Sequence, residues 1–210
     1  MRKLACMTLA VFLLGCSFGR EEAAPKYQTV AVDPRRNTEE AKRMNGQAVQ
    51  DIEAGKLDAA EEKLKAALDA DIFFGPAHNN LGMVYYRQEK YYVAAWELQY
   101  AAKLMPGKAE PLHNIGLVFE AVGKLDEAAE NYEKALVADP EAMEPTCSLA
   151  RLRVRQNKKD DRTRGLLEKI VMREDRPEWI EWARERLSLI GRPKPTTQPA
   201  ESMPMDLRGG

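Results

Sequence analysis

The chain has 210 residues, of which 44% are hydrophobic, and its 32 Lys and Arg residues nearly balance 33 Asp and Glu residues. This composition is typical of a soluble globular protein with one domain or two small ones, and it gives no reason to expect a nucleic-acid partner. Three cysteines are too few for a disulfide framework, which excludes the small disulfide-rich class.

The N-terminal segment has the layout of a secretory signal. Two basic residues, Arg2 and Lys3, precede an apolar run over residues 4–14, which is too short for a membrane span of about 20 residues. The Leu-Leu-Gly-Cys sequence at residues 13–16 resembles the lipobox of bacterial lipoproteins. That resemblance implies a signal peptide over residues 1–15, cleavage before Cys16, and a lipid on the Cys16 thiol. The alternative is an ordinary secretory signal that is cleaved elsewhere.

The lipobox resemblance also implies a location. We expect a lipid-anchored protein of the bacterial cell envelope that faces the periplasm. Ser17 replaces the aspartate that retains lipoproteins in the inner membrane of some enteric bacteria, so the outer membrane is preferred. The segment after Cys16, residues 16–37, contains charges and prolines that break any periodicity, which predicts a disordered tether.

An internal repeat occupies the centre of the chain. Residues 79–107 align without a gap on residues 113–141, at a period of 34. The match becomes weaker one period earlier and one period later. The same period places Gly55, Glu89, Gly123 and Asn157 at equivalent turns, where glycine or asparagine suits a left-handed residue that ends a helix.

A 34-residue unit with this pattern resembles the tetratricopeptide repeat, which implies an all-α fold. We expect an α-solenoid of antiparallel helix pairs over residues 38–191, with about three to four repeats. Small residues predict close helix packing, with large side chains filling the remaining space, and prolines end the second helices. The small residues are Gly82, Gly116, Ala94, Ala101, Ala128 and Ala135; the large ones are Tyr85, Leu98, Phe119 and Tyr132; the prolines are Pro106 and Pro140.

The solenoid is expected to end in a capping helix over residues 177–190. Its apolar face includes Trp179, Ala183 and Leu187, and terminal repeats need such a cover. Trp179 and Trp182 are interpreted as packing residues, with a ligand site as the alternative. The four prolines in residues 192–210 predict a disordered tail.

The repeat resemblance implies a binding groove along the first helices of the two strongest repeats. It assigns partner contact to nine residues: Asn79, Asn80, Met83, Tyr86, Arg87, His113, Asn114, Leu117 and Glu120. Amides such as Asn80 can bond the backbone of an extended peptide, or they can instead bond neighbouring helix ends. Val49 and Glu110 do not supply the basic groups of the dicarboxylate clamp that binds chaperone tails.

Charge is unevenly distributed over the last two repeats. The third repeat is rich in Asp and Glu, whereas residues 151–164 carry a run of Arg and Lys. Two interpretations remain open: solvated outer faces, or a basic patch that meets anionic lipid or an acidic partner.

The sequence gives little support for an enzyme. The two histidines, His78 and His113, lack metal-ligand spacing, and no glycine-rich phosphate loop is present. Cys147 has no assignable catalytic partner and is expected to be either a small apolar packing residue or a semi-exposed thiol. We therefore predict no catalytic residue, metal, cofactor or small-molecule substrate, with a hydrolase as a distant alternative.

Two functions remain. The first is a membrane-anchored scaffold or adaptor that binds a protein or peptide partner through its concave groove. The second is a permanent structural subunit of an envelope assembly machine, packed through its convex face or its terminal helix. A contiguous exposed apolar patch outside the groove would favour the second.

Overall fold

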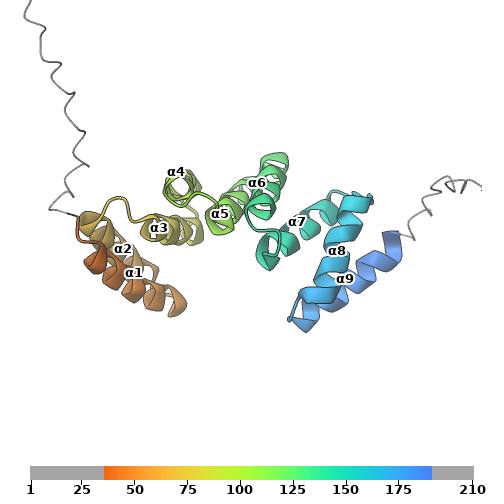
Figure 1. Ribbon diagram of the computed structural model, residues 1–210, viewed down its shortest axis with the longest axis horizontal. Coiled ribbons are helices and arrows are strands. Elements are labelled where there is room, and N and C mark those ends of the chain that lie inside the picture. The colour runs from red at the N-terminus through yellow and green to blue at the C-terminus, as the bar shows by residue number, and fades with distance from the viewer. Residues whose placement is uncertain (1–35, 191–210) are drawn as a thin grey trace, which may run out of the picture. The chain divides into compact units, whose positions relative to one another are not determined.

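The computed structural model describes residues 36–190, and all regular structure in that range is helical (Figure 1). The signal segment 1–15, Cys16, most of the tether and the tail 192–210 lie outside the described residues. The helices are α1 (Thr38–Glu53), α2 (Leu57–Ala70), α3 (Gly75–Arg87), α4 (Tyr91–Leu104), α5 (Ala109–Ala121), α6 (Leu125–Ala138), α7 (Met143–Arg155), α8 (Asp161–Arg173) and α9 (Pro177–Ile190).

These helices form an α-solenoid, which confirms the predicted fold class. Consecutive helices pair as α1 with α2, α3 with α4, α5 with α6 and α7 with α8, and each pair packs on the next. The first helices α1, α3, α5 and α7 also contact one another in that order, so they form one layer. The second helices form the other layer, and α9 packs on α8 as the terminal helix (Figure 1).

Each hairpin turn is built on one left-handed residue at the position that the repeat predicts. The φ angles are 73° at Gly55, 61° at Glu89, 79° at Gly123 and 56° at Asn157. The next residue, a lysine each time, donates its backbone N–H to the carbonyl five positions earlier, at 2.8–3.0 Å. This bond satisfies a carbonyl at the helix end and reverses the chain direction.

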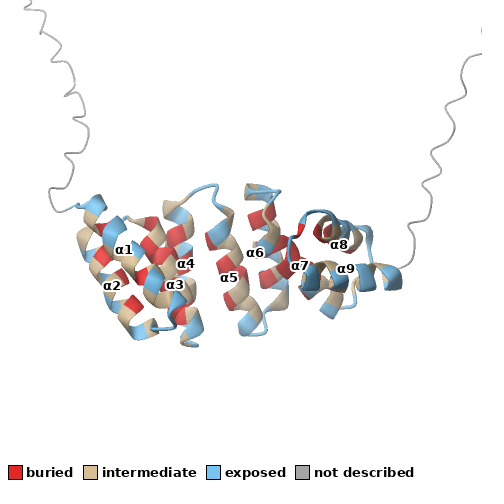
Figure 2. Cartoon of the chain, turned by 90° about the horizontal axis from the view of Figure 1, so that it is seen from below, coloured by how far each residue is buried: buried red, intermediate tan, exposed pale blue. Residues whose placement is uncertain are grey.

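Close helix packing follows from the small residues of the repeat. Ala94, Ala101 and Ala128 are fully buried, and a Cβ added to Gly82 would lie 2.6 Å from Leu98 Cγ. Gly116 meets the ring of Tyr132 in the same way. The glycines therefore leave room for large side chains from the paired helix, and Figure 2 shows the buried residues on the facing sides of the helices.

Of the large side chains expected in the core, Tyr85, Leu98 and Tyr132 are buried, but Phe119 is only half-buried. Its ring contacts both clusters of buried residues, one over α1–α5 and one over α6–α9. One side of the ring stays open, with the Lys124 ammonium 5.9 Å from the centroid. Phe119 thus joins the two clusters at the edge of the core.

The start of the solenoid is fixed by a buried carboxylate. Asn37 caps α1 by accepting a hydrogen bond from Glu40 N–H at 3.1 Å. The fully buried Asp71 accepts from Thr38 Oγ1 at 2.6 Å and from Arg36 Nε at 3.0 Å. Burial alone would raise the Asp71 pKa, but these bonds outweigh it and the pKa lies below its usual value. Arg36 and Asn37, assigned to the tether from the sequence, are therefore fixed to the helices.

The end of the solenoid buries Cys147 beneath the α8–α9 corner. Its thiol donates to Glu174 Oε2 at 3.3 Å, and burial, followed by this bond, raises the Cys147 pKa to about 12. Arg176 holds the Glu174 carboxylate at both oxygens, at 2.7 and 2.8 Å. Cys147 is thus a packed, protonated thiol, which corresponds to the first of the two structural roles expected from the sequence and not to a semi-exposed thiol.

Candidate functional site

Three hollows follow one another along the first-helix layer. The largest, about 610 Å³, lies over α3, α5 and α7 and is lined by Met83, Lys108, Ala109, Glu110, His113, Asn114, Leu117, Asp139, Ala142, Glu144 and Pro145. The second, about 230 Å³, shares Leu117 and adds Tyr86, Glu120, Ala121, Arg151 and Arg155. The third, about 250 Å³, shares Arg151 and adds Glu178, Trp179 and Trp182. We call the three hollows together the inner groove.

Six of the nine predicted contact residues line the inner groove. They are Met83, Tyr86, His113, Asn114, Leu117 and Glu120. Asn79, Asn80 and Arg87 do not line any of the three hollows. Six of the nine candidates therefore share one surface, and their contact with a partner stays a prediction.

The asparagines join neighbouring helices. Asn114 Nδ2 donates to Asn79 Oδ1 at 3.0 Å, and Asn79 Nδ2 donates to Glu110 Oε1 at 2.8 Å. One repeat earlier, Asn80 Nδ2 donates to Asn45 Oδ1 at 2.9 Å. Asn79 and Asn114 are buried. Their amides bond side chains of neighbouring first helices and hold these helices in register, which is nearer to the helix-end bonding left open by the sequence than to peptide binding.

Arg87 also has a structural contact. Its Nη1 donates to the carbonyl of Ile52 at 3.2 Å, near the C-terminal end of α1. A guanidinium at this place satisfies a helix-end carbonyl and complements the negative end of the helix dipole. Arg87 therefore connects two repeats.

His113 is an uncharged part of the groove wall. Its Nε2 lies 3.0 Å from Ser148 Oγ, and its ring centroid lies 5.5 Å from that of Tyr132. Burial lowers the His113 pKa to about 4. The imidazole is consequently neutral at pH 7 and offers a partner an aromatic surface without charge.

Glu120 is held by its own chain. Tyr132 Oη donates to Glu120 Oε2 at 2.8 Å, while Arg151 Nη2 and Arg155 Nη1 each lie 3.2 Å from the carboxylate. The Glu120 side chain is only 11% exposed, whereas both guanidinium groups are about half exposed. The arginines, with five N–H donors each, are the groups that this hollow presents to a partner.

The first two hollows of the inner groove differ in charge. Three acidic residues and one lysine line the first hollow (Glu110, Asp139, Glu144 and Lys108), and Arg151 and Arg155 lie beside Glu120 in the second. Because α5 has 13 residues, it extends for about 20 Å between these regions. Met83 and Leu117 supply apolar surface between the charges. This arrangement suits an extended segment or a helix that carries charges of both signs.

Sequence reasoning missed the contribution of the fourth repeat. Glu144, Arg151 and Arg155 lie on α7, one period of 34 after Glu110, Leu117 and Ala121. Carrying the groove positions one period further would have found them. Lys108, Asp139 and Ala142 come from the connections between repeats, for which the helical period gives no signal.

The tryptophans of α9 have two roles. Both pack on the C-terminal cluster of buried residues, as expected for a terminal helix. Their rings are edge to face, with centroids 5.3 Å apart, and the pair also lines the third hollow beside Arg151. Trp179 and Trp182 thus extend the inner groove onto the capping helix.

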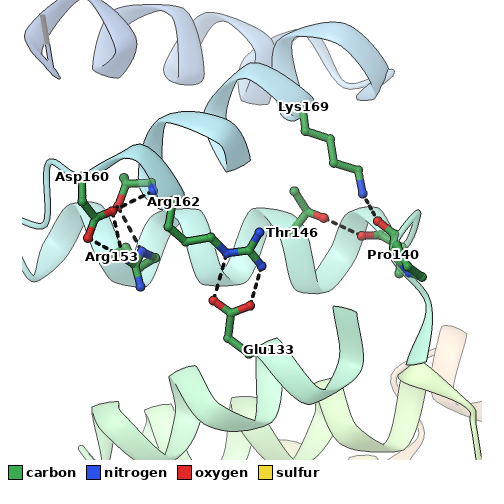
Figure 3. Close-up of polar contacts among 9 residues, drawn as sticks. Glu133, Pro140, Thr146, Arg153, Asp160, Arg162 and Lys169 are labelled. Carbon is green, nitrogen blue, oxygen red and sulfur yellow. Dashed lines mark hydrogen bonds and ion pairs between the residues drawn. The ribbon is translucent and has the colours of Figure 1, made fainter. Parts of the chain in front are cut away.

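The basic run over residues 151–164 is largely paired within the fold. Arg162 contacts both oxygens of Glu133 on α6, and Arg153 binds Asp160 at the start of α8 (Figure 3). Nearby, Lys169 donates to the carbonyl of Pro140. Both interpretations of the run, solvated outer faces or a basic patch that meets anionic lipid or an acidic partner, stay predictions, because Arg151, Arg155 and Arg162 keep about half of their side-chain surface exposed. The Arg162–Glu133 pair joins the acidic third repeat to the basic fourth repeat, whereas Arg153 and Asp160 both belong to the fourth.

Residues 36–190 contain no group of three His, Cys, Asp or Glu side chains that could hold a metal ion, and no helix in this range is long and apolar enough to cross a bilayer. His78 is buried, with Nδ1 2.7 Å from Glu97 Oε2 and Nε2 2.8 Å from the Ile72 carbonyl. It is used to hold the fold.

Comparisons with known proteins agree with this architecture. The family profile described as tetratricopeptide repeat matches residues 109–142, which cover α5, α6 and the connection to α7. The described solenoid has the tetratricopeptide-repeat fold. Among curated proteins, no sequence matched this chain.

Solved tetratricopeptide-repeat (TPR) structures resemble the chain at low identity. The first TPR of Spaghetti (RPAP3), bound to the HSP90 peptide SRMEEVD, is 23% identical with a TM-score of 0.55, covering 59% of this chain and 98% of that one. A TPR protein from Parabacteroides merdae is 19% identical with a TM-score of 0.59, covering 72% and 60%.

An O-GlcNAc transferase from Thermobaculum terrenum is 23% identical with a TM-score of 0.58. The likeness covers 63% of this chain but only 26% of the enzyme, so it shows a shared TPR fold and no shared chemistry. TPR proteins are generally scaffolds without catalytic activity. The fold is typical of protein–protein interaction.

Proposed function

We propose that this chain is a membrane-anchored TPR adaptor of the bacterial cell envelope, and that its inner groove binds an extended peptide or helix of a protein partner. The observation that carries the proposal is the continuity of the three hollows, which share Leu117 and Arg151. A continuous groove with apolar surface between charged groups suits the recognition of a chain segment.

Peptide-bound relatives support this choice of partner. The second TPR domain of human RPAP3, solved in complex with the HSP70 peptide SGPTIEEVD, is 22% identical with a TM-score of 0.51. The groove chemistry here is different from a dicarboxylate clamp, because Glu110 occupies a clamp position and accepts a hydrogen bond from Asn79. We therefore propose a partner segment with a basic residue toward Glu110 and Glu144 and an acidic residue toward Arg151 and Arg155.

The groove is tested after the partner has been recovered by crosslinking with mass spectrometry from intact cells. The variant Tyr86→Ala with Arg155→Ala removes an aromatic surface and an exposed guanidinium, each of which anchors about 1–3 kcal/mol in typical interfaces. We expect binding to weaken by at least tenfold while the helical circular-dichroism signal is retained.

The matched control changes two exposed lysines of the second-helix layer, Lys103→Ala with Lys134→Ala. This control should keep wild-type affinity. Loss of the partner in the control, with retention in the groove variant, would contradict the groove proposal.

The anchor is tested separately. A lipid on Cys16 would hold the protein on the membrane, because each buried CH₂ contributes about 0.8 kcal/mol and several acyl chains together anchor stably. Cys16→Ser should therefore move the protein to the aqueous phase of a detergent extraction. Continued partition into detergent would refute lipid attachment at this residue.

The second candidate function is permanent packing through the convex face or α9. One observation favours it: apolar side chains outside the inner groove are exposed on α4, with Tyr92 and Trp96 among them. The same surface carries the inference that follows.

A further inference from the structure

A row of aromatic side chains lies on the outward face of α4. Tyr92 is 85% exposed and Trp96 is 66% exposed, and Tyr100 continues the row as a half-buried residue. The spacing of four residues places the three side chains on one helix face over about 12 Å. Since α4 belongs to the second-helix layer, this face is separate from the inner groove.

The apolar surface continues from α4 onto the connection between α2 and α3. The His78 ring contacts Tyr100 edge to face, with centroids 4.6 Å apart, and His78 Nε2 lies 2.8 Å from the Ile72 carbonyl. Ile72 and Phe73 are 59% and 52% exposed. We define the outer aromatic strip as Ile72, Phe73, Tyr92, Trp96 and Tyr100.

Buried polar groups hold the loop part of the strip in place. The Asp71 carboxylate accepts the Phe73 backbone N–H at 3.1 Å, and the Arg36 guanidinium, paired with Asp71, lies 5.7 Å from the Phe73 ring centroid. Beneath Ile72, His78 Nδ1 lies 2.7 Å from Glu97 Oε2. The exposed apolar residues are therefore fixed by the fold, which lowers the entropic cost of binding a partner.

The neighbouring repeats carry acids where α4 carries its two exposed aromatic residues. One period before and after Tyr92 are Asp58 and Asp126, and one period before and after Trp96 are Glu62 and Glu130, of which Glu130 is paired with Lys134 at 2.8 Å. The exposed part of the outer aromatic strip therefore takes the place of carboxylates that α2 and α6 carry at the equivalent positions. An acid at these positions is compatible with the fold, so the aromatic residues are not needed for packing.

We propose that the outer aromatic strip docks a cationic amphipathic helix of a partner protein. The apolar side of such a helix would cover Tyr92 and Trp96, and its Lys and Arg residues would reach the flanking carboxylates of α2 and α6. Arginine over the Trp96 ring adds a cation–π contact. The same carboxylates repel anionic lipid and nucleic acid, which leaves a basic protein segment as the matching occupant. This surface acts independently of the inner groove.

The test uses the whole chain and a defined probe. The probe is a fluorescently labelled 18-residue peptide of Leu and Lys, patterned as an amphipathic helix, and its comparison peptide has Glu in place of every Lys. The variant Tyr92→Asp with Trp96→Glu gives α4 the residues of its neighbours. It adds negative charge, so binding by charge alone would become tighter, whereas binding to the strip would become weaker.

We expect the Leu/Lys peptide to bind the native chain, and the double variant to lose at least tenfold in affinity by fluorescence anisotropy. Val137→Glu, which places one charge at another exposed apolar residue of α6, is the matched control and should bind as the native chain does. Unchanged or tighter binding by the double variant would overturn the proposal, as would equal binding of the Leu/Glu peptide. Strip-dependent binding to phosphatidylglycerol vesicles in place of the peptide would overturn it as well.

Discussion

Replacement of one helical glycine tests whether close helix packing controls the stability of the solenoid. An added Cβ at Gly116 would lie 2.6 Å from Tyr132 Cδ1, well inside van der Waals contact. Tyr132 is fully buried and its hydroxyl is bonded to Glu120, so the ring has little freedom to move away. We therefore expect Gly116→Ala to destabilise the protein.

The size of the effect follows from two opposing terms. Overfilling a packed core costs about 1–3 kcal/mol. Replacing glycine by alanine inside a helix stabilises the folded state by about 0.5–1 kcal/mol, because alanine has the higher helix propensity. The net loss at Gly116 is therefore about 1 kcal/mol, and at most about 2.5 kcal/mol. Gly46 lies in α1 with nothing within 4 Å of its added Cβ, so Gly46→Ala keeps only the favourable term and stabilises by about 0.5–1 kcal/mol.

Urea unfolding of the two variants, followed by circular dichroism, measures these effects. The midpoint should fall for Gly116→Ala and rise for Gly46→Ala, and adding Tyr132→Leu to Gly116→Ala should recover part of its loss by removing the overlapping ring. Shifts of the same sign and size for both glycine variants would refute the packing argument.

Three further predictions concern the core and the α8–α9 corner. Because Ala128 is fully buried, Ala128→Phe should lower the free energy of unfolding, measured in urea, by about 1–3 kcal/mol. Lys124→Ala at the exposed turn should leave it nearly unchanged. The hydrogen bond from Arg176 lowers the Glu174 pKa to about 2. The stability that this carboxylate contributes is therefore present above pH 4.5 and lost as the pH falls toward 2, and Glu174→Gln should make the urea midpoint less acid-sensitive over that range. Because Cys147 is buried with a raised pKa, a thiol reagent should label it only after urea unfolding; rapid labelling of the native chain, absent from Cys147→Ser, would contradict this.

Most of the solenoid was predictable because the repeat is encoded locally. Turn residues such as Gly55 and Asn157 end helices through their own backbone preferences, and Ala and Gly at fixed spacing define which helix faces approach. The repeat resemblance also predicted six of the residues that line the inner groove. Arg151 and the other groove residues of α7 were missed because the groove positions were not carried into the weakly matching fourth repeat.

The sequence by itself determined the helix pairs, their order and the faces that pack, since these depend on the type and spacing of neighbouring residues. Only the tertiary structure decided which polar groups remain available to a partner. Asn79 and Asn114 bond each other across two helices, Arg162 is taken up by Glu133, and Tyr92 stays exposed where its counterparts are acids. The first two outcomes depend on partner residues about 30 or more positions away in the sequence, and the third depends on which side chains the folded chain covers. The helical period of a single segment contains neither kind of information.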